Sequence, residues 1–280
     1  MSSPGAAALR RNGLGWYLYG VIAASEAPVH LGARGAVDPV HEVELVTEGP
    51  LAGVASRVSL QEFDEETLPD RLGDASWLEQ KIRAHEQVLE GLLDEVSVVP
   101  CRFCTVYTSE AELRRFLSER GEALGAALDR VQGQVEVGVK AFIDRDRFAA
   151  GRAVRNDAIR ELESQASAAE GGRAYLERRR LDQLIRSELE RFTDEAAAEI
   201  HSRLLAVTDD GLLLPLQTRE VSGRDHEMFF NGAYLVNADQ SAFKETLAVL
   251  AGDYRETGVD LEATGPWPPY NFVPAELGAS

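Results

Sequence analysis

The chain has 280 residues, of which 44% are hydrophobic and 27% charged. This is an ordinary globular composition for one large domain or two modest ones. Its formal net charge of −18 argues against a nucleic-acid or anionic-membrane partner, because both attract basic surfaces. No apolar run approaches the ~20 residues that span a bilayer, and two cysteines do not make a disulfide framework. We therefore expect a cytoplasmic protein.

The first half predicts an N-terminal α+β domain over residues 13–132, after a disordered start at 1–12. The apolar run from Leu14 to Ala24 is typical of a central strand buried on both faces. Alternating residues at 42–46 and 54–58, with Gly49-Pro50 between them, predict a hairpin.

Two helices are expected in the rest of this domain. After an acidic loop at 61–74, a helix over 75–96 should bury one stripe of apolar residues together with His85. The apolar members of that stripe are Leu78, Ile82, Leu89, Leu92 and Val96. A short strand region over 97–107 is interrupted by Pro100, and a second helix over 109–130 has Ser109 as its N-cap.

The second half predicts a ferredoxin-like domain over residues 133–264. Strict alternation from Val135 to Ile143 predicts a strand, and a long helical insertion at 148–207 is interrupted by Gly171-Gly172. The remaining predicted elements are strands at 212–219 and 228–236 around a polar turn, a helix at 239–256 and a strand at 259–263. This order is β-α-β-β-α-β, the ferredoxin-like pattern.

The tail at 265–280 contains the segment GPWPPYNF. Its prolines exclude a helix or a central strand. Burying Trp267, Tyr270 and Phe272 is worth roughly 1.5–3 kcal/mol each. We therefore expect the tail to pack back on the protein and hold its two halves together. Asn271 should anchor the tail through side-chain hydrogen bonds to the backbone.

The sequence predicts no active site. Cys101-Arg102-Phe103-Cys104 has the C-x-x-C spacing of a redox or half-zinc motif, but it stands alone, so two small buried hydrophobic residues are the favoured interpretation. The five histidines form no metal-spaced cluster, and His85 is better explained as a core or interface residue. We therefore expect no catalytic residue, no cofactor and no metal.

A charged helical run from Arg173 to Arg203 includes three consecutive arginines, Arg178 to Arg180. A solvated face with i, i+4 pairs is the ordinary interpretation. The functional alternative is a docking face for an acidic helix of a partner.

Several segments, in order along nearly the whole chain, resemble the gas vesicle accessory proteins of the GvpF/GvpL family. They are GWYLYGV at 15–21, HEQVL at 85–89, VVPCRFCTV at 98–106, VEVGVK at 135–140, GRAYL at 172–176, NGAYLV at 231–236 and GPWPPYNF at 265–272. The chain departs from the family at Cys104, where glycine is usual, and at Cys101, where an aliphatic residue is common. Size and tail favour a GvpF-type member.

The resemblance implies a two-domain fold and a non-enzymatic role in building gas vesicles. The implied partners are the hydrophobic GvpA-like shell subunit, whose aggregation the protein would limit while helping to nucleate the vesicle, and other accessory gas vesicle proteins. It also implies a cytoplasmic location, associated with the gas vesicle, as an assembly factor or minor structural component. Candidate structural or interface residues are His85, Arg102, Phe103, Tyr175, Tyr234, Trp267, Tyr270, Asn271 and Phe272. Alternatives are a small-ligand binder or enzyme on the ferredoxin-like scaffold, and a scaffold that gathers accessory proteins through the helix at 173–203.

Overall fold

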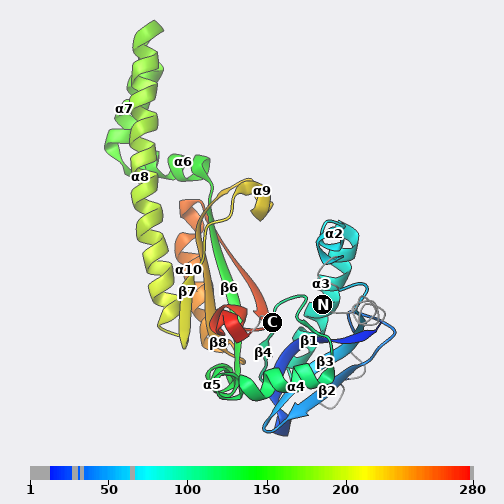
Figure 1. Ribbon diagram of the computed structural model, residues 1–280. Coiled ribbons are helices and arrows are strands. Elements are labelled where there is room, and N and C mark those ends of the chain that lie inside the picture. Colours follow the sequence, from blue (N-terminus) through cyan, green and yellow to red (C-terminus); the bar gives the residue numbers. More distant parts are fainter. Residues whose placement is uncertain (1–12, 27–30, 32–34, 64–66, 278–280) are drawn as a thin grey trace. The chain divides into compact units, whose positions relative to one another are not determined.

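The computed structural model describes residues 13–26, 31, 35–63 and 67–277 (Figure 1). The start at 1–12, for which the sequence predicts disorder, lies outside the described residues. The chain separates into two compact units. Unit 1 comprises Met1–Glu136 and Pro266–Ser280, and unit 2 comprises Val137–Gly265.

Unit 1 is built on a sheet with strand order β2-β3-β1-β4, in which β5 also pairs with β1. The predicted central strand and hairpin are confirmed: β1 lies between its neighbours, and β2 and β3 turn at Gly49, whose φ is +57°. The elements of this unit are β1 (Leu14–Ala23), η1 (Ala24–Glu26), β2 (Val43–Glu48), β3 (Leu51–Ser59), α2 (Leu68–Leu72), α3 (Ala75–Leu93), β4 (Val99–Pro100), β5 (Val106–Tyr107), α4 (Glu110–Glu119), α5 (Gly121–Val131), η4 (Tyr270–Phe272) and η5 (Ala275–Leu277).

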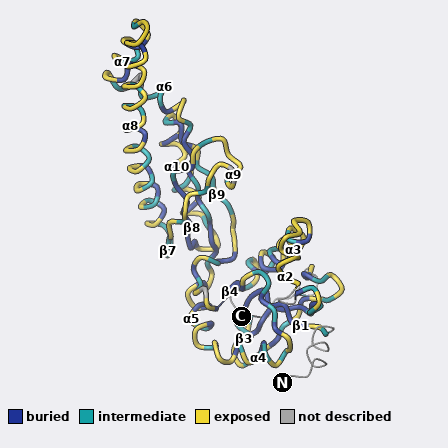
Figure 2. The backbone as a smooth tube through the Cα atoms, turned by 45° about the horizontal axis from the view of Figure 1, so that its top comes forward, coloured by how far each residue is buried: buried dark blue, intermediate teal, exposed yellow. Residues whose placement is uncertain are grey.

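Alternate residues of β1 enter two separate cores. Trp16 and Leu18 pack with the apolar faces of α4 and α5, whereas Tyr17 and Tyr19 pack with α3 on the other side. Successive side chains of a strand point to opposite faces, so covering the sheet on both faces explains the continuous apolar run. In Figure 2 this strand is buried along nearly its whole length.

The helices of unit 1 differ from expectation in three places. The buried face of α3 runs through Trp77, Lys81 and His85, so Ile82 is exposed rather than buried. The predicted acidic loop contains the short helix α2. The second predicted helix is divided into α4 and α5 at Arg120; its N-cap is confirmed, because the Ser109 side chain accepts a hydrogen bond from the backbone N–H of Glu112.

Unit 2 has a sheet with strand order β7-β8-β6-β9. One core joins inward residues of β6 and β8 to α8 and α10, so both helices cover the same face. The elements are β6 (Gln134–Ile143), α6 (Arg145–Arg155), α7 (Asp157–Ala168), α8 (Gly171–Leu205), β7 (Asp210–Leu213), α9 (Arg219–Ser222), β8 (Glu227–Asn237), α10 (Ser241–Tyr254), η3 (Arg255–Thr257) and β9 (Val259–Trp267). Their order repeats the predicted alternation of strands and helices.

The helices and strands of unit 2 differ from the prediction in three places. The predicted pair of helices is three helices, because the chain leaves helical geometry at Asn156 as well as before Gly171. β7 ends at Leu213 rather than at 219, two residues before Pro215. β9 continues to Trp267; Pro266 is tolerated there because β9 is an edge strand.

Candidate functional site

The tail reaches α3 of unit 1 through a chain of buried hydrogen bonds. His85 Nδ1 lies 3.0 Å from the Tyr17 hydroxyl, and His85 Nε2 lies 3.0 Å from the Tyr270 hydroxyl. Tyr270 in turn donates to Glu86 Oε1 at 3.1 Å. His85 and Tyr270 are 185 positions apart in the sequence, and the imidazole joins Tyr270 to Tyr17.

The positions of the protons in this hydrogen-bond network follow from the partners of each group. Burial lowers the pKa of His85 to about 4, so the imidazole is neutral at pH 7. Because Tyr270 gives its proton to Glu86, its oxygen accepts from Nε2–H of His85, and Nδ1 accepts from Tyr17. The Tyr17 oxygen also accepts from the backbone N–H of Cys104 at 3.0 Å. Each hydrogen bond in this network therefore has one donor and one acceptor.

Asn271 holds the tail to a buried carboxylate. Its backbone N–H donates to Glu136 Oε2 at 2.9 Å, and its Nδ2 donates to Oε1 at 2.5 Å. Burial raises the pKa of Glu136, against the opposing effect of these two hydrogen bonds. The acceptor is a side chain and not the backbone expected from the sequence, because the carboxylate can accept both Asn271 donors at once.

The residues of the tail differ in burial: Pro268 and Pro269 are buried, and the three aromatics differ from one another. Phe272 is buried, as is Leu277, which joins the core beneath α4 and α5. Tyr270 packs against the opposite core. Trp267 is 37% exposed, so the expectation that all three aromatics pack back is wrong for this residue. It stands at the end of β9, before the tail reaches its contacts.

The C-x-x-C segment belongs to the same region. Phe103 lies with its ring centroid 5.9 Å from that of His85, whereas Arg102 is exposed and contributes its backbone carbonyl to Thr105. Cys101 and Cys104 are free thiols. Burial raises the pKa of Cys101 to about 12 and that of Cys104 to about 11, so little of the nucleophilic thiolate exists near neutral pH.

Two predicted residues belong to unit 2. Tyr234 is fully buried, and its hydroxyl lies 2.9 Å from His201 Nδ1. Tyr175 is 64% exposed in the first turns of α8. The other predicted residues all belong to unit 1: His85, Arg102, Phe103, Trp267, Tyr270, Asn271 and Phe272.

Sequence reasoning did not single out Tyr17, Glu86 or Glu136. The signals were present: Tyr17 is a hydroxyl within an apolar strand, and Glu136 is a carboxylate within the alternating strand at 135–143. A polar group forced into a buried strand needs a partner. Its partner here comes from a distant segment, which no local pattern specifies.

Unit 2 has an apolar groove of about 640 Å³ between α8 and the β7–β8 hairpin. We call it the leucine groove. Its polar lining comes from His201, Ser202 and Asn231, and its apolar lining is Ala197, Ala198, Leu205, Leu213, Leu214, Leu216, Phe229 and Phe230. Leu213 is 63% exposed and Leu216 is 56% exposed. No charged side chain appears among these residues, in a chain with a net charge of −18.

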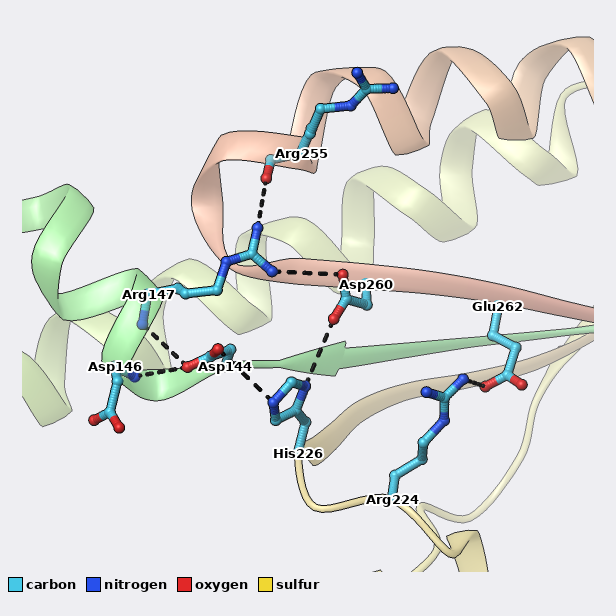
Figure 3. A network of polar contacts seen from close by, with 8 residues as sticks. All are labelled: Asp144, Asp146, Arg147, Arg224, His226, Arg255, Asp260 and Glu262. Carbon is cyan, nitrogen blue, oxygen red and sulfur yellow. Dashed lines mark hydrogen bonds and ion pairs between the residues drawn. The ribbon is translucent and has the colours of Figure 1, made fainter.

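A second polar cluster surrounds His226 in unit 2 (Figure 3). The imidazole lies 3.7 Å from Asp144 and 3.5 Å from Asp260. Asp144 caps α6 by accepting from the backbone N–H groups of Asp146 and Arg147, and the latter bond is the main reason that its pKa is lowered. Arg147 also reaches Asp260 and the carbonyl of Arg255. The cluster thus ties α6 to β8, β9 and η3 at the surface, which is a structural role.

Within the ranges given above, no group of three or more His, Cys, Asp or Glu side chains could hold a metal ion. Among the same residues no helix is long and apolar enough to cross a membrane.

The geometry therefore defines a mixed helix-and-sheet protein with a bound tail and an open apolar groove. The family model "Gas vesicle synthesis protein GvpL/GvpF" matches residues 15–274. The chain belongs to this gas vesicle protein family.

Named relatives agree with this membership. Gas vesicle protein L of Streptomyces sp. (strain CB03234) is 31% identical over 92% of each chain. Gas vesicle protein F of the same strain is 25% identical over 92% of this chain and 98% of the relative. Gas vesicle protein L1 of Halobacterium salinarum is 27% identical over 93% and 90%. The sequence of this chain is thus more similar to the L protein of this Streptomyces strain than to its F protein. Size and tail had favoured an F-type member instead.

Solved structures show the same fold. The crystal structure of GvpF from Anabaena sp. PCC7120 matches with a TM-score of 0.68 at 19% identity, covering 93% of this chain and 98% of that one. GvpF from Microcystis aeruginosa matches with a TM-score of 0.63 at 18% identity, covering 92% and 98%.

Proposed function

We propose that the protein is a non-enzymatic gas vesicle assembly factor, or a minor component of the vesicle, that binds the GvpA-like shell subunit in the cytoplasm. Binding would limit aggregation of the shell subunit and help to nucleate the vesicle. We also propose that the two domains are 13–132 and 133–264. Family membership supports the vesicle role, and the leucine groove supports contact with an apolar partner.

The groove is the observation that carries the binding proposal. A soluble protein rarely leaves a contiguous apolar surface open, and such surfaces mark interaction sites. Leu213 and Leu216 are more than half exposed, and the groove also offers hydrogen-bonding groups on His201, Ser202 and Asn231. An apolar segment lying there would bury these leucines without desolvating a charge. The edge of β7 is less available for strand pairing, because Asp210 accepts from the backbone N–H of Gly211 at 2.8 Å.

Co-expression with the shell subunit tests the proposal. The wild-type chain should keep shell subunit in the soluble fraction and retain it in pull-down. Leu213→Glu combined with Leu216→Glu should abolish both effects, because two charges would be buried on binding. Val249→Glu is the matched control, since Val249 is an exposed apolar residue on α10, outside the groove lining.

The proposal fails if the shell subunit aggregates equally with and without the wild-type chain. If the wild type binds but the groove variants bind equally well, the groove is not the binding surface. Circular dichroism of each variant would verify folding.

A further inference from the structure

The first half of α8 extends past the core of unit 2 and packs beside α7 (Figure 1). Its inner face is formed by Ala174 and Glu177, which are buried, while Ile159 and Ala166 are buried on α7. The residues of α8 that enter the core of unit 2 begin only at Leu189. The outer face of α8 before that point is therefore not needed to cover the sheet.

This outer face combines exposed apolar and basic side chains. Tyr175 is 64% exposed and Leu176 is 55% exposed. Leu176, Arg179, Gln183 and Arg186 follow one another at steps of three, four and three and are all exposed, which places them along one stripe of the helix. We call this set, with Tyr175, the α8 outer stripe.

The arginines of the stripe differ from other arginines of α8 in their partners. Elsewhere on α8, Arg180 pairs with Glu177 and Arg191 pairs with Glu188. Neither Arg179 nor Arg186 forms an ion pair or hydrogen bond with any residue that the structure describes. Asp182 lies three residues after Arg179 and four before Arg186, and it is exposed without an ion pair to a described residue. Guanidinium groups left free beside an exposed tyrosine match the composition of binding hot spots.

We propose that the α8 outer stripe docks an acidic amphipathic helix of a partner protein. An apolar residue of that helix would cover Tyr175 and Leu176, and carboxylates further along would pair with Arg179 and Arg186. The contact would span about 15 Å, the ten helical rises of 1.5 Å between Leu176 and Arg186. A nucleic acid fits less well, because binding a phosphate backbone takes a larger basic surface than the two arginines of this stripe. This inference goes beyond shell binding and concerns a different surface from the leucine groove.

A charge exchange with synthetic peptides tests the proposal on the full chain. The probe is a fluorescein-labelled helical peptide of about 20 residues, long enough to form a helix, with leucines followed by glutamates on the same face. The control peptide has the same composition with its glutamates on the opposite face. Fluorescence anisotropy should show about tenfold tighter binding of the first peptide, as expected for two charge-assisted contacts.

The double variant Arg179→Glu with Arg186→Glu should lose that preference, and a peptide with lysines in place of the glutamates should regain it. Arg145→Glu with Arg219→Glu, two exposed residues outside α8, changes the net charge equally and should bind like the wild type. Equal binding of both peptides, failure of the lysine peptide, or tighter binding of a single-stranded RNA oligonucleotide to this stripe would overturn the proposal. The assay contains no shell subunit, so its outcome is independent of the function proposed above.

Discussion

The tail region of unit 1 and the outer surfaces of unit 2 differ in how far their large side chains are buried. In unit 1, Phe272 is buried and Tyr270 has both a proton donor and an acceptor. In unit 2, Leu213, Leu216 and Tyr175 are more than half exposed. Buried, satisfied groups stabilise a fold, whereas exposed apolar groups contribute little until a partner covers them. Stability should therefore depend on the first region and binding on the second.

The largest expected effect on stability follows from removing a buried aromatic side chain of the tail. Phe272→Ala should destabilise the protein by about 3–5 kcal/mol, the usual cost of removing a buried phenyl ring. Trp267→Ala is the matched control and should cost less, because the indole is partly exposed. Thermal unfolding followed by circular dichroism would measure both.

Equal melting temperatures for the two variants would contradict the contrast between tail residues. Leu213→Ala sharpens the comparison with unit 2: it should leave the melting temperature nearly unchanged while weakening capture of the shell subunit.

The next effect concerns pH. The pKa of His85 is about 4 in the folded chain, below its ordinary value of about 6.5. As the pH falls, His85 therefore binds its proton at a higher pH in the unfolded chain than in the folded chain. The stability due to neutral His85 is complete above pH 6.5 and is lost toward pH 4, by up to about 3 kcal/mol.

His85→Gln removes this titration while keeping a hydrogen-bonding amide. Burial raises the pKa of both Glu86 and Glu136, which opposes the trend, so the informative quantity is the difference between wild type and variant. That difference, measured by urea unfolding from pH 7 to pH 4, should shrink as the pH falls. A constant difference would show that His85 titrates normally in the folded state.

The smallest effect concerns Cys104, whose φ is +66°. A left-handed conformation costs a non-glycine residue roughly 1–2 kcal/mol. Cys104→Gly should relieve that cost and raise the melting temperature slightly, offset by the loss of a half-buried thiol. Cys101→Gly, at a fully buried position, is the contrasting variant and should destabilise; a lower melting temperature for both would count against backbone strain at Cys104.

Local patterns determined most of the secondary structure. The apolar run at 14–24, the Gly49-Pro50 turn and the alternation at 135–143 each specify one conformation, because side-chain periodicity and turn chemistry act over a few residues. The second half of the buried face of α3 agrees with the prediction, since His85, Leu89 and Leu92 are buried. Its first half is displaced by one position, because Trp77 and Lys81 are buried. Lys81 pairs with Glu62 at 2.9 Å and donates to the Val37 carbonyl. The spacing of apolar residues along a helix does not predict a buried lysine whose acceptors lie far away in the sequence.

The sequence by itself predicted the burial of Phe272 and the family that the chain resembles. Tertiary structure decided which groups meet. Glu136 became the acceptor for Asn271, Tyr17 and Tyr270 became the two neighbours of His85, and Leu205, Leu213 and Leu216 came together in one groove. Hydrogen bonding and burial depend on distances in space, and these contacts join residues that are far apart along the chain, where periodicity carries no information.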